Sequence, residues 1–244
     1  MKYLSSKSTT LAVTILAASL LSACGSSSDD DDVVVVDVPD ETAMVSYDIT
    51  LTNLTANQPL SPLAAQLHAS DYQAWKVGSV ASESLEILAE GGDNAALLAV
   101  DSASVYSAVS GTGAVAPGVT QTLTISAEEA GEMELTLLTM LVNTNDAFAG
   151  KTGLDLSALA MGESMKQFLP VYDAGTEGNS ELAGTIPGPA DEAGEGFNMA
   201  RDDVDFVARH PGVVGMDHGY SESVLNSTHG FDSPAAVLTV TRTQ

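Results

Sequence analysis

Residues 44–54, MVSYDITLTNL, alternate between apolar and polar side chains along most of their length. Successive side chains of an extended strand point to opposite faces, so this pattern predicts a strand with one buried face. That face would carry Val45, Tyr47, Ile49 and Leu51. We therefore expect the folded part of the chain to begin near Ala43. We also expect this strand to belong to a sheet that has one face packed against a hydrophobic core.

Three further segments have the composition and patterning of strands: 121–128, 132–142 and 235–243. Gly131 separates the first two segments. A glycine between two short strand patterns is typical of a hairpin turn, so we expect these two strands to pair with each other.

Residues 79–92 predict a helix, because four apolar side chains recur at helical spacing: Ala81, Leu85, Leu88 and Ala89. The Gly91-Gly92 pair is expected to end this helix. Between residues 179 and 231, glycine, proline and acidic residues are frequent, which predicts long loops. The fold class we expect is all-β, an antiparallel β-sandwich with one or two short helices in the connections.

The N-terminal segment has the features of a bacterial export signal. Lys2 and Lys7 supply positive charge, and residues 11–23 form an apolar segment too short to favour a membrane-spanning helix. The segment ends in LSAC, which resembles the lipobox, where cysteine is lipidated and becomes the first mature residue. Cys24 is the only cysteine, and lipidation would give this lone thiol a role. The alternative is an ordinary cleaved signal that contains a cysteine.

These boundaries divide the chain into three parts. Residues 1–23 are the predicted lipoprotein signal peptide, residues 24–42 an acidic flexible tether, and residues 43–244 one folded domain. The tether includes GSSSDDDD, whose aspartates repel one another and extend the chain. A calcium-binding aspartate run is the alternative interpretation of the same residues.

The chain is strongly acidic, with 33 acidic and 8 basic residues and a formal net charge of −25. Such a chain repels phosphate backbones, so we expect no nucleic-acid partner. Divalent cations or basic partners suit this charge better.

The stretch VYDAGTEGN, residues 171–179, places two acids around a glycine. Gly175 would let the loop turn so that Asp173 and Glu177 face the same point. Taken alone, this loop is either a solvated turn or part of a cation site.

Several stretches, taken in order, resemble the spondin N-terminal domain family, which occurs in F-spondin, mindin and bacterial exported proteins. They are LHASDYQAWKVGSVASESLEILAEGGD (67–93), LTLLTMLVNTNDAFAGKTGLDL (135–156) and PVYDAGTEG (170–178). Their order and approximate spacing resemble the family pattern from Tyr47 to Arg242, which is nearly the whole predicted domain.

The resemblance implies an antiparallel β-sandwich with one calcium ion in the loops at one end. The family's ligand positions match Asp146, Asp173 and Glu177 in this chain. Two residues depart from the family pattern: Ala147 stands where tryptophan is frequent, and Glu177 stands where aspartate is usual. Calcium takes six to eight oxygen ligands, so backbone carbonyls and water would have to complete the shell. The ligand spacing of an EF-hand is absent.

The function we expect is that of a calcium-binding, spondin-like domain of an exported bacterial lipoprotein with a binding or adhesion role, and not of an enzyme. It would be attached to the outer membrane or cell surface by its N-terminal lipid, facing the periplasm or the exterior. Its ligand would be a protein or a glycan that the sequence does not identify.

An alternative is a metal-dependent hydrolase that uses the histidine-bearing region near the C-terminus. Its candidate residues are His210, His218 and His229 with Asp217 and Asp232. Imidazole and carboxylate groups suit zinc, but the spacing matches no zinc motif that we recognise, and Ser221 stands in no nucleophile elbow.

Three residues in the first family-like stretch have simpler interpretations. We expect His68 to be a hydrogen-bonded histidine and not a ligand, and Tyr72 and Trp75 to contribute to the core.

The lipoprotein interpretation predicts that protein extracted from membranes begins at an acylated Cys24. Intact-mass spectrometry of the extracted protein measures this directly, and Cys24→Ser is expected to remove the added acyl mass. A soluble chain with an unmodified cysteine would contradict the interpretation.

Overall fold

The computed structural model describes residues 43–192 and 194–244. The predicted signal peptide, Cys24 and the tether lie outside the described residues. In the described part of the chain, no helix has the length and apolar character needed to cross a membrane.

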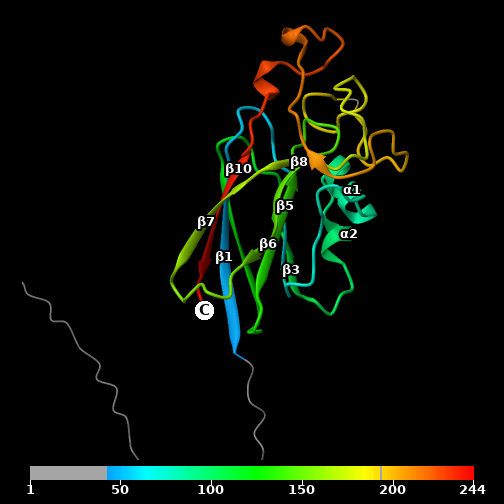
Figure 1. The fold of residues 1–244 in the computed structure, drawn as a ribbon. Helices are drawn as coiled ribbons and strands as arrows, with labels where there is room; N and C mark the ends of the chain where they lie inside the picture. Colours follow the sequence, from blue (N-terminus) through cyan, green and yellow to red (C-terminus); the bar gives the residue numbers. More distant parts are fainter. Residues whose placement is uncertain (1–42, 193) are drawn as a thin grey trace, which may run out of the picture. The chain divides into compact units, whose positions relative to one another are not determined.

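The elements follow one another in an order dominated by strands (Figure 1). In chain order they are β1 (Met44–Asn53), β2 (Ala64–His68), α1 (Glu83–Gly91), α2 (Ala95–Leu98), β3 (Val105–Ser110), β4 (Thr120–Glu128), β5 (Glu134–Met140), β6 (Ala147–Asp155), β7 (Ser164–Leu169), β8 (Val171–Asp173), β9 (Ala208–Arg209), the 3₁₀ turns η1 (Met216–His218) and η2 (Ser227–His229), and β10 (Ala236–Arg242).

The first strand lies inside a four-stranded sheet of order β4-β1-β10-β7. Its predicted alternation is confirmed, because its apolar side chains are buried and the intervening polar side chains are more exposed. On the polar face, the hydroxyl groups of Thr50 and Thr122, which are paired across β1 and β4, lie 2.8 Å apart. The buried face of β1 contributes to the core between the two sheets.

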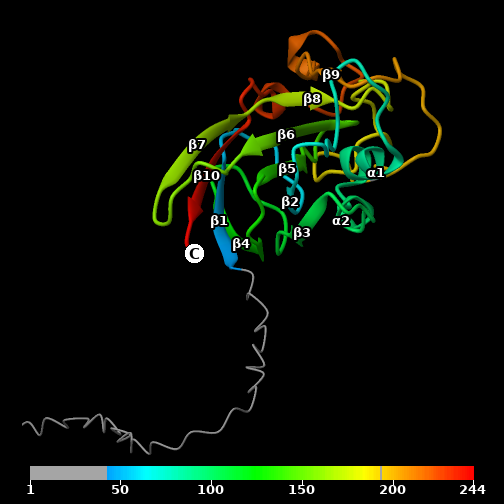
Figure 2. The same ribbon diagram turned by 60° about the horizontal axis from the view of Figure 1, so that its bottom comes forward.

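The second sheet has six strands in the order β3-β2-β5-β6-β8-β9, with antiparallel pairing throughout. One face packs against the four-stranded sheet, and the other is covered by α1 and α2 (Figure 2). A group of aromatic side chains also lies on this outer face. Because both faces are covered, β2 is buried throughout and β5 nearly so. The predicted antiparallel β-sandwich with short connecting helices is confirmed.

Helix α1 begins four residues later than the segment predicted from the sequence. Ser82 is its N-cap, and the Ser82 hydroxyl accepts a hydrogen bond from the Leu85 N–H at 3.2 Å. Before the cap, Gly78 and Ser79 exchange backbone hydrogen bonds with Val207, so these residues are not helical. The C-terminal prediction is correct, since Gly92 adopts φ = 69° and caps the helix.

The predicted hairpin around Gly131 is wrong. Strand β4 pairs with β1, whereas β5 pairs with β2 and β6, so the two strands belong to different sheets. Both strands supply side chains to the shared core, Ile125 from one sheet and Leu135 from the other. Strand β5 is buried on both faces and pairs with β2 along one edge and β6 along the other, so neither edge is free for β4. The glycine therefore lies in a connection that crosses between the sheets.

The predicted long loops between residues 179 and 231 are confirmed. Among the described residues of this region, which leave out residue 193, the regular elements are β9 and the two 3₁₀ turns. These loops gather around the end of the sandwich where β8 ends (Figure 1).

The aromatic group on the outer face of the six-stranded sheet should be a main source of stability. Phe148 contacts Trp75 edge-to-face and stacks with Tyr172, at ring-centroid distances of 5.1 and 5.3 Å. We predict that Phe148→Ala lowers the free energy of unfolding by about 3–5 kcal/mol, because it removes a buried ring and leaves a cavity. Urea unfolding measures this change.

Met161→Ala is the matched control for this substitution, because Met161 is 73% exposed. Its effect should stay within about 0.5 kcal/mol. A Phe148→Ala effect no larger than that of the control would show that the aromatic group does not stabilise the fold.

Candidate metal site

Two of the predicted ligands are brought together by the pairing of β6 with β8. Asp146 directly precedes β6, and Asp173 is the last residue of β8. The register places Asp173 opposite Ala147, and the Ala174 N–H donates to the Asp146 carbonyl oxygen at 3.3 Å. The backbone of two adjacent strands therefore holds the two carboxylates side by side.

The Asp146 carboxylate is fully buried, and its two oxygens have different surroundings. Oδ2 accepts hydrogen bonds from the N–H groups of Thr176 and Glu177, at 2.9 and 3.2 Å. Oδ1 has no hydrogen-bond partner in the described structure. Burial, followed by the charge of Asp173, raises the pKa of Asp146 to about 7. A buried carboxylate oxygen without a donor is suited to a cation.

Asp173 is also buried, and both of its oxygens accept hydrogen bonds. Oδ1 accepts from the Gly175 N–H at 2.8 Å, and Oδ2 accepts from the Asn179 amide at 2.6 Å. Burial nevertheless raises the pKa of Asp173 above its ordinary range.

The turn after Asp173 requires glycine. Gly175 has φ = 72°, and a Cβ at this position would lie 2.3 Å from the carbonyl oxygen of Phe206. The close approach of Phe206 holds the acidic loop against the segment that leads into β9.

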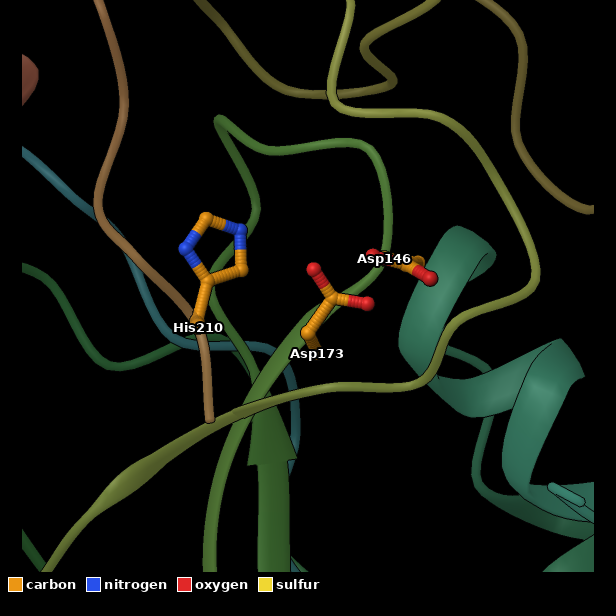
Figure 3. Close-up of side chains that lie close together, drawn as sticks. All are labelled: Asp146, Asp173 and His210. Atoms are coloured by element: carbon orange, nitrogen blue, oxygen red, sulfur yellow. The ribbon is translucent and has the colours of Figure 1, made fainter. Parts of the chain in front are cut away.

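His210, which follows β9, lies beside the two aspartates (Figure 3). One potential ligand atom from each of Asp146, Asp173 and His210 lies within 4.8 Å of the other two. The Gly212 N–H donates to Nδ1 at 3.0 Å, so Nε2 carries the ring proton and donates to Asn179 Oδ1 at 2.9 Å. Burial lowers the pKa of His210 to about 4, which keeps the ring neutral. Both ring nitrogens of His210 are thus engaged in hydrogen bonds. His210 lies beside the carboxylates, but neither nitrogen is free to bind a metal ion.

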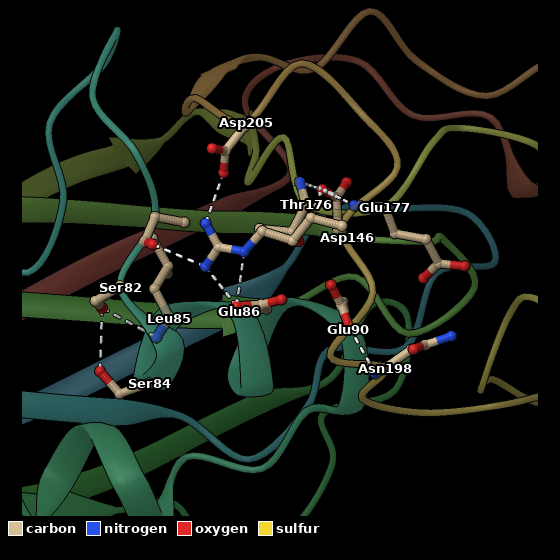
Figure 4. A network of polar contacts seen from close by, with 12 residues as sticks. Ser82, Ser84, Leu85, Glu86, Glu90, Asp146, Thr176, Glu177, Asn198 and Asp205 are labelled. Atoms are coloured by element: carbon tan, nitrogen blue, oxygen red, sulfur yellow. Dashed lines mark hydrogen bonds and ion pairs between the residues drawn. The ribbon is translucent and has the colours of Figure 1, made fainter.

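The Glu177 carboxylate does not join this group. Its Oε1 accepts a hydrogen bond from the Asn145 amide at 2.9 Å, although the Glu177 backbone N–H faces Asp146. Burial raises the pKa of Glu177 to about 8, and the charges of Glu90, Asp146 and Glu195 add to this shift. The structure therefore joins Asp146 to Asp173. The Glu177 side chain extends away from the Asp146 carboxylate, although its backbone N–H faces that carboxylate (Figure 4).

Another acid on the loop before β9 faces the paired aspartates. The pKa of Asp203 is raised by partial burial and by the charge of Asp173. No basic side chain forms an ion pair with Asp146, Asp173 or Asp203 among the described residues. The site thus concentrates negative charge without a protein cation to balance it.

These observations fit calcium. The available donors are carboxylate oxygens, one of them buried without a partner, and the loop backbone can supply carbonyl oxygens. The nearby imidazole uses both nitrogens in hydrogen bonds, so the donor set favours a hard, oxygen-binding cation over zinc.

The three histidines of the alternative hydrolase site do not converge. His218 is exposed, and His229 lies in the capping box of η2, where Nδ1 accepts from the Asn226 N–H. Asp146, Asp173 and His210 make up the one group of three potential metal-binding side chains found within residues 43–192 and 194–244.

The interpretations of His68 and Trp75 are confirmed, whereas Tyr72 is only partly buried and belongs to neither core cluster. His68 is buried, with Nδ1 2.8 Å from the Ala69 carbonyl oxygen and Nε2 2.8 Å from the Thr136 hydroxyl. Trp75 is buried in the outer core, and the partly buried Tyr72 donates a hydrogen bond to Gln66.

A two-sheet antiparallel sandwich with buried aspartates in its end loops defines a β-sandwich module with a candidate cation site. Within this class, the chain belongs to the spondin N-terminal domain family, because the family model described as Spondin_N matches residues 52–188, more than half of the chain. No match was found among the curated proteins.

The family match includes Asp146, Asp173 and Glu177, whereas His210 lies beyond its end. The sequence pattern groups His210 with the other histidines near the C-terminus, and it does not single out Asn145 or Asn179. Asn145 directly precedes the predicted ligand Asp146, and this adjacency is a sequence signal that the polar residues before β6 belong to the same site. Strand β9 has only two residues, too few to show a pattern that would position His210.

The titration of the site predicts how stability depends on pH in the presence of a chelator. Between pH 6.5 and 8 the folded chain retains protons on Asp146 and Glu177 that the unfolded chain has lost. Stability should therefore fall as the pH rises through this range. Below pH 6.5 the depressed pKa of His210 opposes the trend, because the unfolded chain then binds the additional proton.

Urea unfolding at pH 6.5 and pH 8 measures this dependence. Asp146→Asn should reduce the loss of stability between the two conditions, since it removes one of the responsible carboxyl groups. A wild-type stability that rises from pH 6.5 to pH 8 would contradict the burial of protonated carboxyl groups.

Proposed function

We propose that this domain binds calcium through Asp146 and Asp173, and that the bound ion organises a ligand-binding surface at the loop end of the sandwich. The observation that carries the proposal is the Asp146 carboxylate, which is fully buried and has one oxygen without a hydrogen-bond donor. Membership of the spondin N-terminal domain family supports the same assignment.

The chain's own residues would prepare the site in three ways. The Thr176 and Glu177 N–H groups orient the Asp146 carboxylate, and Asn179 orients Asp173. The same Asn179 amide accepts from His210, so the ring helps to fix the Asp173 carboxylate. Calcium would supply the positive charge that these buried acids lack and would draw their loops together.

The role of Glu177 as a third ligand of this ion remains a prediction. Its backbone already contacts Asp146, but its carboxylate is held by Asn145. The extra methylene that distinguishes glutamate from aspartate gives the side chain the reach to turn toward Asn145.

We further propose that the domain acts in binding or adhesion as part of an exported lipoprotein, anchored in the outer membrane or at the cell surface through Cys24. An acidic tether would hold the domain away from the membrane. The net charge of −25 favours a basic protein partner or a glycan that contacts the bound ion, and disfavours nucleic acid.

Calorimetric titration of the chelated domain with calcium tests the proposed function. The wild type should bind calcium, and Asp173→Asn should weaken binding at the Asp146–Asp173 site by at least about tenfold, equivalent to about 1.4 kcal/mol. The substitution removes a ligand charge and keeps the size of the side chain.

Asp101→Asn is the control for net charge, because Asp101 is exposed and lies outside the candidate site. It should bind calcium like the wild type. A wild type that takes up no calcium would refute the proposed function, and equal effects of the two substitutions would refute the assignment of the site.

A further inference from the structure

Large apolar side chains are exposed on two segments at the loop end of the domain. One segment is the connection before α1, residues 69–82, and the other is residues 197–207, which lead into β9. Single exposed apolar residues are normal, whereas a group of them marks an interaction site. The group, called the apolar patch below, is between 43% and 81% exposed and consists of Val77, Val80, Met199, Val204 and Phe206.

Backbone hydrogen bonds join the two segments around Val207, which is itself buried. The Gly78 N–H donates to the Val207 carbonyl oxygen at 2.8 Å, and the Val207 N–H donates to the Ser79 carbonyl oxygen at 2.9 Å. The two valines of the first segment stand directly before and after Gly78 and Ser79, and Phe206 directly precedes Val207. These exposed side chains therefore start from adjacent stretches of backbone.

The second segment is also fixed against helix α1. Arg201 forms an ion pair with Glu86 of α1, and its Nη2 donates to the Ala81 carbonyl oxygen at 2.9 Å. The Asn198 N–H donates to Glu90 Oε2 at 2.9 Å (Figure 4). Ala81 and Asn198 are each next to a residue of the apolar patch in sequence. The patch is thus held in place before a partner binds, which lowers the entropic cost of binding.

The same segment contacts the acidic loop of the candidate metal site through its backbone. The Asp205 N–H donates to the Gly175 carbonyl oxygen at 2.8 Å, and the Asp202 N–H donates to the Thr176 carbonyl oxygen at 3.1 Å. The apolar patch therefore borders the metal site and shares none of the predicted ligands with it.

The charge around the patch restricts the chemistry of its partner. Residues 69–82 and 197–207 together carry four acidic and two basic side chains, and Asp202 and Asp203 form no ion pair among the described residues. These acids disfavour an anionic membrane surface or a nucleic acid. A glycan would leave the apolar side chains without apolar contacts. A protein segment that is both apolar and basic matches the two properties of this surface.

We propose that the apolar patch is the docking surface for a basic amphipathic segment of a partner protein. Apolar side chains of the partner would cover the patch, and its lysine or arginine side chains would lie near Asp202 and Asp203. This inference deepens the proposed function and rests on it for the binding role of the domain. It assigns that role to a surface and chooses a basic protein over a glycan as the partner.

Binding of a synthetic amphipathic helix made of leucine and lysine tests the inference. The labelled peptide is titrated with the full chain in calcium at an ionic strength of about 0.15 M, where charges on exposed groups are screened beyond about 8 Å. Fluorescence anisotropy should show saturable binding. A peptide with serine in place of leucine keeps the charge and should bind at least about tenfold more weakly, because it buries no apolar surface.

The double variant Val80→Ser/Val204→Ser should weaken binding of the leucine–lysine peptide by at least about tenfold. The matched control is Val119→Ser/Met161→Ser, because these two side chains are 47% and 73% exposed and lie outside the apolar patch. The control should bind the peptide like the wild type. Thermal unfolding establishes that both variants are folded. If the first variant does not fold, Met199→Ser takes its place, since Met199 is the most exposed residue of the patch.

Equal binding of the two peptides, or equal effects of the two double variants, would overturn the inference. Vesicles of anionic phospholipid provide a further comparison, and patch-dependent binding to the vesicles but not to the peptide would replace the protein partner by a membrane surface. Calcium titration of the same proteins separates this inference from the proposed metal site. Loss of peptide binding with normal calcium uptake in Val80→Ser/Val204→Ser supports the patch. A wild type that takes up calcium but binds no peptide would overturn the inference and leave the metal site intact.

Discussion

The burial of two like-charged carboxylates at the ends of adjacent strands determines how the loop end of this domain is built. The pairing of β6 with β8 fixes Asp146 beside Asp173, in a place where water does not compensate their charge. Each carboxylate must then obtain hydrogen bonds from its surroundings or retain a proton. The turn at Gly175 brings the Thr176 and Glu177 N–H groups to Asp146, and Asn179 reaches back to Asp173. The fold of the acidic loop is thus a response to the two buried charges.

The rest of the sandwich supports this arrangement through the six-stranded sheet. That sheet is covered on both faces, and the packing of α1 on its outer face places Glu90 near the acidic loop (Figure 4). Residues beyond the family match add β9 and His210, which cover the opposite side of Asp173. The site is therefore assembled from three regions of the chain that are distant in sequence.

The sandwich and the loop end could be predicted from local patterns, because an alternating strand such as β1 has one buried face wherever it lies. The partner of β4 could not be predicted in this way. The apolar face of β4 is compatible with a hairpin to β5 in one sheet and also with a crossing to the other sheet. The pairing of β5 with β2 and β6, and its burial on both faces, distinguish these two arrangements. Asp146 and Asp173 were found through the family motifs. The orientation of the Glu177 side chain was not, since it depends on a hydrogen bond from Asn145 that spacing does not reveal.

The central claim is that Asp146 Oδ1 is a calcium ligand. A crystal structure of the domain grown with calcium tests it most directly. The account predicts an ion in contact with Asp146 Oδ1 and with the Asp173 carboxylate, at the distances of about 2.3–2.6 Å typical of calcium–oxygen bonds. Occupation of the space beside Asp146 Oδ1 by a hydrogen-bonded side chain or by water alone, at saturating calcium, would contradict it.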